Sequence, residues 1–111
     1  MSSLQMVEAS NMRVFLTNLR PSIVLLKDGT SLEGQKELAN VLQLSVSTEF
    51  TRVRALQDTS RPWSEFIADL LQLRETLKLV SSTRADSASC TDRVDIVWKQ
   101  LEATQLAAAK L

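Results

Sequence analysis

The stretch that decides the fold is SRPWSEFIADLLQLRETLKLV, which occupies residues 60–80. Its large apolar side chains recur at spacings of three and four, the pattern of an α-helix with one buried side. These side chains are Trp63, Phe66, Ile67, Leu70, Leu71, Leu73, Leu77 and Val80. Ser60 is suited to cap the first turn, and Pro62 lies where its missing N–H does no harm. The apolar row covers about half of the helix circumference, which predicts contact with more than one neighbouring helix.

Three other segments show the same apolar spacing, two of them before residue 60 and one after residue 86. Their rows are Met12, Phe15, Leu16, Leu19, Ile23 and Leu26 in the first segment, Leu38, Leu42, Val46, Phe50, Val53 and Leu56 in the second, and Val94, Val97, Trp98, Leu101 and Ala108 in the last. Each segment is predicted to form an amphipathic helix. The first helix begins after Ser2 or Ser3, and the last continues into the Ala-rich residues 104–111.

The junction between the first two predicted helices carries several helix-end signals. Pro21 either kinks the first helix or begins a second short one. Asp28 and Gly29 end the segment, because glycine readily adopts the left-handed conformation of a C-cap. Thr30 and Glu33 have the spacing of a capping box, in which the Thr30 side chain accepts the Glu33 amide.

A second interpretation of this junction is a pair of β-strands. Residues 23–32 place Lys-Asp-Gly-Thr between apolar residues, as in a hairpin turn, and the stretch resembles the start of an Sm-like barrel. Residues 35–40 then lack the period-two alternation of a strand, which favours the helical interpretation.

Short breaks also follow the second and third predicted helices. Residues 58–60 end the second helix, and the Ser- and Thr-rich residues 81–89 form a loop, with Asp86 or Ser89 as the next cap. Short connections make neighbouring helices antiparallel. The chain has only two glycines and two prolines, fewer turn-forming residues than a β-sheet needs. The sequence therefore predicts an all-α fold, an antiparallel bundle of about four helices in one domain over residues 1–111.

Charge and composition narrow the classes of partner. The thirteen basic residues balance thirteen acidic ones, whereas nucleic-acid-binding proteins usually carry a basic excess or stripe. The longest apolar runs, such as residues 23–26, are far too short to span a bilayer. Cys90 is the only cysteine, and neither an N-x-S/T sequon nor a signal-peptide pattern occurs. These features predict a cytoplasmic or organelle-matrix protein with no nucleic-acid partner and no membrane span.

No pattern of reactive residues predicts an enzyme. The sequence contains no histidine, so zinc and di-iron ligand sets are not expected, and it has no Gly-rich phosphate loop. Cys90 has no imidazole to act as its base and is interpreted as a plain loop thiol. Six carboxylates of the last two helices are interpreted as parts of solvated helix faces. They are Glu65, Asp69, Glu75, Asp92, Asp95 and Glu102. The expectation is a protein without metal, cofactor or catalytic residues.

Several aliphatic residues fall outside the apolar rows. They are Val14 of the first helix, Val41 and Leu44 of the second, Leu79 of the third and Ile96 of the last, accompanied by Val7 and Leu25. Together they are predicted to form a second surface that contacts a protein partner or another copy of the chain. The alternative is that a kink at Pro21 rotates the faces and buries these residues within the fold.

Glu49 is a charged residue within the apolar row of the second helix, close to Ser45. One interpretation is a buried carboxylate that fixes the helix register or pairs with an arginine of a partner. The other is a side chain at the edge of the row that reaches water, since charged residues are almost never fully buried unpaired.

These observations favour a non-enzymatic helical subunit that binds protein partners or associates with itself. The alternative comes from Ala109, Lys110 and Leu111, because Ala-Lys-Leu resembles the Ser-Lys-Leu peroxisomal address. On that alternative the chain is a peroxisomal or glycosomal matrix protein that binds an apolar ligand between its helices.

Overall fold

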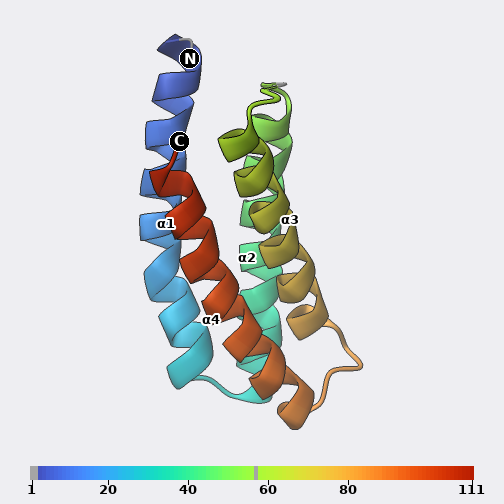
Figure 1. The fold of residues 1–111 in the computed structure, drawn as a ribbon. Coiled ribbons are helices and arrows are strands. Elements are labelled where there is room, and N and C mark those ends of the chain that lie inside the picture. Colours follow the sequence, from blue (N-terminus) through green and yellow to red (C-terminus); the bar gives the residue numbers. More distant parts are fainter. Residues whose placement is uncertain (1–2, 57) are drawn as a thin grey trace.

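The computed structural model describes residues 3–56 and 58–111, and these residues form four helices and no strand. The helices are α1 (Ser3–Asp28), α2 (Leu32–Arg54), α3 (Arg61–Ser81) and α4 (Ser87–Ala109). They run alternately up and down, with the two chain ends at the same end of the bundle (Figure 1). The all-α bundle predicted from the apolar spacing is confirmed.

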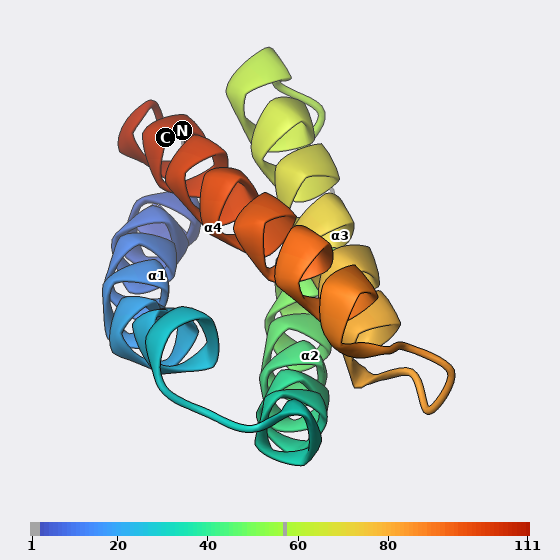
Figure 2. The same ribbon diagram turned by 90° about the horizontal axis from the view of Figure 1, so that it is seen from below.

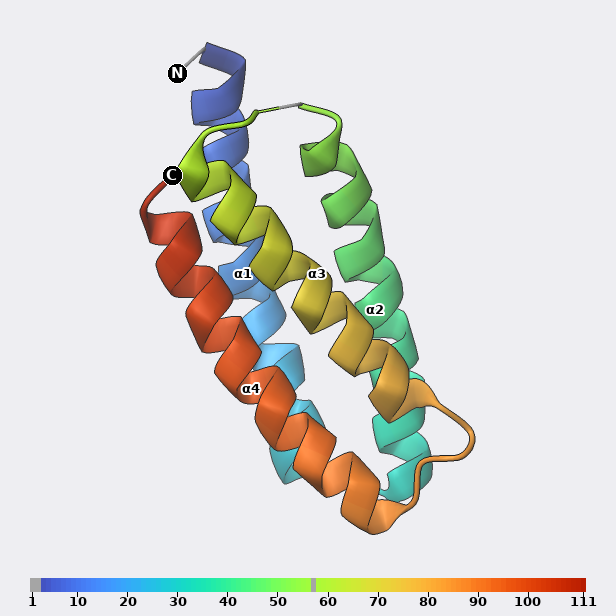
Figure 3. The same ribbon diagram turned by 45° about the vertical axis from the view of Figure 1, so that its right-hand side comes forward.

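The helices follow one another around the bundle, so each packs against its neighbours in sequence, and α1 also packs against α4. Figure 2 shows this order from one end, with α4 crossing obliquely between α1 and α3. The α2–α3 and α3–α4 pairs make the most extensive contacts, and α1–α2 is the loosest pair of neighbours. Figure 3 shows α3 and α4 together on one side, with α1 behind them. The α1–α2 seam and the α3–α4 seam therefore lie on opposite sides of the bundle.

The predicted apolar rows form the core. Most of their members are buried, and the partly exposed ones still pack against the core. These partly exposed members are Phe15, Leu38, Leu56, Ile67, Leu71 and Trp98. Trp63 and Phe66 of α3 are fully buried, and their rings meet edge to face at 5.9 Å. The wide row of α3 contacts both α2 and α4, as its width predicts.

Helix α1 continues through Pro21 without interruption, so the prediction of a separate short helix is wrong. The kink at Pro21 within one long helix stays a prediction. Pro21 lies on the exposed side, where its ring leaves only the carbonyl of Thr17 without a backbone donor. The strand interpretation of residues 23–32 is also wrong. Ile23 and Leu26, about one turn apart, are both fully buried, which is the geometry of a helix and not of a strand.

The turn between α1 and α2 differs in detail from its prediction. The last turn of α1 closes with an ordinary bond from the Gly29 N–H to the Leu25 carbonyl, at 3.2 Å. Gly29 has no left-handed φ, so the predicted left-handed cap is wrong. Ser31, one residue after the predicted Thr30, caps α2 by accepting the N–H of Gly34 at 3.2 Å. The predicted capping box is therefore also wrong, because a glycine occupies the position that would have to reach back.

The loop between α3 and α4 is shorter than predicted and covers residues 82–86. Asp86 caps α4 by accepting the Ser89 N–H at 2.8 Å, as one of the two predictions had it. Ser60 occupies the cap position of α3 but makes no side-chain cap bond. Cys90 is fully buried in the first turn of α4. The prediction of a loop thiol is wrong, because α4 begins before this residue.

The seam between α1 and α4 uses the basic residues of α1. The Arg20 guanidinium lies 4.5 Å and the Lys27 ammonium 5.1 Å from the centre of the Trp98 ring, a favourable placement of cations on an aromatic face. Arg20 also donates to the side-chain oxygen of Gln105 at 2.9 Å. Arg13 donates to the carbonyl of Ala108 at 3.3 Å. These contacts turn the positive charges of α1 toward α4.

Candidate interaction surface

All five aliphatic residues predicted to form a partner-facing surface are exposed. The exposed fractions are 56 % for Val14, 61 % for Val41, 56 % for Leu44, 51 % for Leu79 and 46 % for Ile96. The alternative, in which a kink at Pro21 buries them within the fold, is wrong. Their role at an interface remains a prediction, since a single exposed aliphatic residue is ordinary on a protein surface.

The bundle does not bring these five residues together. Val14 lies on α1, and Val41 and Leu44 lie on α2. Val41 lines the groove between α1 and α2, whereas Leu44 lies in a separate hollow with other residues of α2. Leu79 and Ile96 lie on α3 and α4, where the Leu79 carbonyl accepts a bond from Arg93, three residues before Ile96. The predicted surface therefore divides into two groups on opposite sides of the molecule.

A shallow groove of about 310 Å³ runs between α1 and α2. Its lining residues are Phe15, Asn18, Leu19, Ser22, Val41, Leu42 and Ser45. Phe15, Leu19, Val41 and Leu42 make the lining largely apolar, and the remaining groups are an amide and two hydroxyls. The groove lies where the bundle is most loosely packed, so its apolar lining is only partly covered by the chain itself.

The two helix stretches that border this groove carry almost no charge. The middle of α1, residues 9–19, contains one charged residue, Arg13, and the middle of α2, residues 38–48, contains none. Windows of the same length in α3 and α4, residues 65–75 and 92–102, contain four and five charged residues. The difference is confined to these stretches, because each pair of helices carries eleven charged residues over its whole length. We name the side formed by α1 and α2 the neutral face. Its exposed aliphatic residues include Val7, Val14, Leu25, Val41 and Leu44.

Arg13, Glu8, Glu49 and Arg52, four charged residues near the middle of the neutral face, are turned away from it or paired within the chain. Arg13 reaches to the Ala108 carbonyl on α4. At one end of the α1–α2 seam, Arg52 of α2 pairs with Glu8 of α1 and, at 2.7 Å, with Glu49 of its own helix. The charges at this end therefore satisfy one another, and the middle of the face is left uncharged.

The partner of Glu49 is thus an arginine of its own chain. Its side chain is 21 % exposed, which agrees with the interpretation that placed it at the edge of the apolar row. Hydrogen bonding to Glu49, and then to Glu8, holds the pKa of Arg52 above its ordinary value, against the opposing effect of burial. The cluster joins α1 to α2 across their loosely packed seam.

The α3–α4 side has the opposite character. Arg61 pairs with Glu65 at 2.9 Å, and Arg74 pairs with Glu75 at 2.9 Å. Burial raises the pKa of Asp69 above its ordinary value, and the negative charge of Glu65 adds to this rise. Leu79 and Ile96 are therefore exposed aliphatic residues among many charged ones.

The candidate carboxylates do not gather into one site. Glu65 and Glu75 form ion pairs with neighbouring arginines. Asp92, Asp95 and Glu102 are exposed along α4. Across residues 3–56 and 58–111, no group of three or more acidic or cysteine side chains is placed to hold a metal ion.

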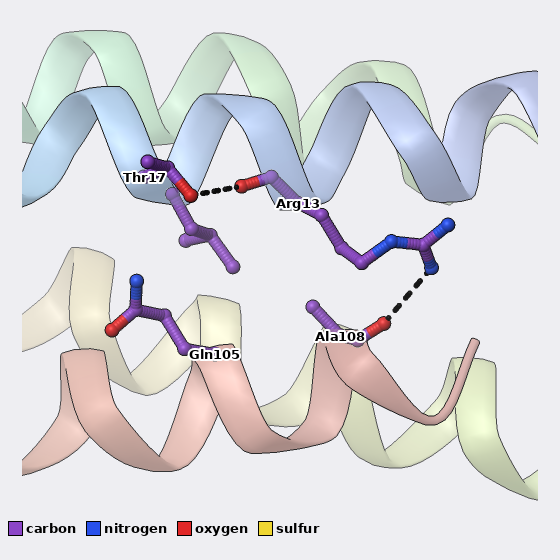
Figure 4. Close-up of a pocket in the computed structure, with 5 residues that line it drawn as sticks. Arg13, Thr17, Gln105 and Ala108 are labelled. Carbon is purple, nitrogen blue, oxygen red and sulfur yellow. Dashed lines mark hydrogen bonds between the residues drawn. The ribbon is translucent and has the colours of Figure 1, made fainter.

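A second pocket lies between α1 and α4 and has a volume of about 190 Å³. Arg13 and Thr17 of α1 and Gln105 and Ala108 of α4 border it (Figure 4). Arg13 spans its mouth to the Ala108 carbonyl, and the Thr17 hydroxyl donates to the backbone carbonyl of Arg13 at 2.9 Å. The volume is below the ~300 Å³ at the small end of ordinary ligand pockets.

The residues of the predicted targeting signal continue the end of α4. Lys110 is the C-cap of the helix, and the Leu111 N–H donates to the Ala108 carbonyl at 3.2 Å. The Leu111 side chain is partly buried against the core, whereas Ala109 and Lys110 are exposed. A receptor that reads the three residues in an extended form would first have to detach Leu111.

Sequence reasoning found the aliphatic residues of the neutral face but missed its uncharged polar ones. These are Asn18, Ser22 and Ser45 in the groove, and the exposed Asn11 and Thr48 occur on the same two helices. The signal that would have found them is the lack of charge over residues 9–19 and 38–48. Solvent-facing helix surfaces normally carry charged residues, so their scarcity on two neighbouring helices marks one side.

No helix in the described part of the chain is both long enough and apolar enough to cross a membrane. Comparison of the chain with protein-family models, with curated proteins and with solved structures gives no match in any of the three.

Proposed function

We propose that this protein is a non-enzymatic helical interaction subunit, and that the neutral face formed by α1 and α2 is the surface through which it binds. The observation that carries the proposal is the unequal distribution of charge. Residues 9–19 and 38–48 contain one charged residue, against nine in residues 65–75 and 92–102, although each pair of helices carries eleven over its whole length.

The free energy of burial explains why a surface with little charge is suited to bind a partner. Burial of apolar surface is favourable by about 25 cal/mol per Å², whereas burial of a charge without its partner is unfavourable. The centres of protein interfaces are accordingly depleted of charged residues. A face with exposed aliphatic residues such as Val14, Val41 and Leu44, and without central charges, can be covered at little electrostatic cost.

The proposal narrows the predicted interface to one side of the bundle. Val14, Val41 and Leu44 are retained as interface residues, and Val7 and Leu25 extend the surface along α1. Leu79 and Ile96 are left out, because the charged residues of α3 and α4 surround them. This division supplies matched controls, since Leu79 and Leu44 have similar exposed fractions of 51 % and 56 %.

Site-specific photo-crosslinking tests the proposal. A photoreactive amino acid is placed at position 41 or at position 79, and the chain is expressed at its native level. We expect discrete crosslinked products from position 41 and none from position 79. Equal products from both positions, or none from position 41, would overturn the assignment of the neutral face.

The cytoplasmic location is proposed from composition, and the peroxisomal or glycosomal alternative depends on Ala109, Lys110 and Leu111. Deleting Leu111 from a chain tagged at its N-terminus separates the two. Loss of organelle import on deletion would support the alternative. A diffuse cytoplasmic distribution of both chains would support the proposal.

A further inference from the structure

We infer that the seam between α1 and α4 binds an acidic helix of a protein partner. Arg13, Arg20 and Lys27 of α1, which we name the basic row, supply the positive charges that meet its carboxylates. Two shallow hollows beside the arginines receive apolar side chains of the same helix. The basic row is turned toward α4 and away from α2, so a failure here would leave the proposed function of the neutral face untouched.

The two segments that form this seam carry an excess of positive charge. Residues 9–27 of α1 contain three basic residues and no acidic one, and residues 98–111 contain two basic residues and one acidic one. The chain as a whole is neutral, so the remainder carries the opposing excess of negative charge. Clustered charge of one sign attracts partners of the opposite sign and speeds their association.

The spacing of the basic row fits a second helix. Arg13, Arg20 and Lys27 follow one another at intervals of seven residues, which is close to two turns of an α-helix and places them on one side of α1. Successive cations therefore lie roughly 10 Å apart along the helix axis. A partner helix with acidic residues at the same interval presents one carboxylate to each cation, as the flanking charges of a coiled coil do.

No cation of the basic row forms an ion pair within the described part of the chain, where the paired arginines lie on α2 and α3. Arg13 and Arg20 each donate one hydrogen bond to a neutral acceptor of α4, and Lys27 lies against the ring of Trp98. A guanidinium has five N–H donors, and all three side chains are exposed. The row is therefore held in place by α4 and keeps donors for a carboxylate.

Two hollows beside the row supply apolar contacts. One, of about 190 Å³, is bordered by Arg13 and Leu16, and the other, of about 250 Å³, is bordered by Arg20 and Leu106. Gln105 borders both. Leu106 is 69 % exposed, more than any other large apolar side chain of the described residues. Each hollow places an apolar site next to an arginine, and an amphipathic acidic helix offers the matching pair of side chains.

Phosphate-rich partners match this surface less well. A nucleic-acid strand carries a charge about every 3.4 Å of duplex axis, and proteins that bind it commonly contact many phosphates at once. The basic row offers three cations, at intervals of roughly 10 Å. Basic segments that bind anionic membranes contain clusters of about four to eight lysines or arginines. The number and the spacing of the cations therefore favour an acidic helix.

Fluorescence anisotropy of labelled peptides tests the inference on the full chain. The probe is an alanine-based helix of about 20 residues, with glutamates at three positions seven residues apart and a leucine one turn from each. One control peptide has glutamine in place of glutamate, and another has the same composition with the glutamates adjacent. We expect both controls to bind at least about tenfold more weakly than the probe. Equal binding of the probe and either control would overturn the inference.

Substitutions in the row and beside it have opposite expected effects. Arg20→Gln should weaken binding of the probe about fivefold, and Lys78→Gln, the same loss of charge at an exposed position of α3, should leave it unchanged. Glu102→Gln removes the acidic residue that borders the hollow of Arg20 and should strengthen binding about twofold. Glutamine is nearly as favourable in a helix as the residues it replaces, and circular dichroism checks that each variant is folded. Equal losses for Arg20→Gln and Lys78→Gln would contradict the seam as the binding site.

Two further probes distinguish the sources of negative charge. A labelled single-stranded oligonucleotide and vesicles containing phosphatidylserine are titrated with the same chain at the same ionic strength, because every such attraction weakens with salt. We expect both to bind more weakly than the spaced-glutamate peptide. Tighter binding of either one, weakened by Arg20→Gln, would assign the seam to a phosphate ligand and overturn the acidic helix.

Discussion

The two long sides of the bundle differ in how closely their helices pack and in which residues they expose to water. On the α3–α4 side the helices pack closely, and their outer surfaces carry charged residues that keep them solvated. On the α1–α2 side the helices pack loosely, and the stretches around their groove, residues 9–19 and 38–48, expose mainly aliphatic, amide and hydroxyl groups. Loose packing and scarce charge occur together around the α1–α2 groove, which is expected if the groove is covered by another surface.

Truncating a core side chain should lower the free energy of unfolding more than any other change, and by different amounts on the two sides. Leu70→Ala on α3 empties a fully buried site and should lower the free energy of unfolding by about 4 kcal/mol. Leu42→Ala on α2 enlarges the groove, where solvent can enter, and should cost about 2 kcal/mol. Urea unfolding at one protein concentration measures both. Equal losses would show that the α1–α2 seam is packed as tightly as the rest.

The helix caps of the two sides should respond differently to pH. Ser31 caps α2 with an uncharged hydroxyl, so Ser31→Ala should cost about 1 kcal/mol at every pH. Asp86 caps α4 with a carboxylate, and its bonds with Ser89 hold its pKa below the ordinary value of 3.8. Its contribution to stability is therefore complete above the ordinary pKa and is lost as the pH falls through the lowered one.

The difference between wild type and Asp86→Ala should accordingly shrink as the pH falls from 3.8. The difference between wild type and Ser31→Ala should stay constant over the same range. Thermal unfolding of the three chains at a series of pH values measures this. A pH-independent loss for Asp86→Ala would contradict the charged cap.

The ion pair across the α1–α2 seam should make the smallest contribution to the free energy of unfolding. Glu8→Gln removes the negative charge that α1 presents to Arg52 but leaves Arg52 paired with Glu49. Because Arg52 is 40 % exposed, the loss should be about 0.5 kcal/mol in dilute buffer and smaller in high salt. Urea unfolding at two salt concentrations measures it. A loss that is large and independent of salt would mean that the seam depends on this pair more than its exposure suggests.

The helices could be predicted from the sequence because an apolar residue at every third or fourth position is a local property of the chain. The row from Trp63 to Val80 is an example, since every member is buried or packs against the core. Cap positions were less certain, because Thr30 and Ser31 are both competent and only the path of the chain selects Ser31. The buried Cys90 was missed because the start of α4 lies three residues before it.

The candidate surface could be predicted only in part, because the arrangement of the helices decides which exposed residues lie on the same side. The sequence identifies Val41 and Leu79 as lying outside the apolar rows, but it does not say that they face opposite directions. That follows from the order of the helices around the bundle. In the same way, the pairing of Arg52 with Glu8, 44 residues away in the chain, requires the packing of α1 on α2.

Cysteine labelling in a native lysate tests most directly whether the neutral face is covered. The chain's own Cys90 is fully buried and gives little background. In the isolated chain Val41 and Leu79 are 61 % and 51 % exposed, so cysteines at the two positions would react with a maleimide at similar rates. The account predicts that Val41→Cys reacts much more slowly than Leu79→Cys. Equal rates at the two positions would contradict it.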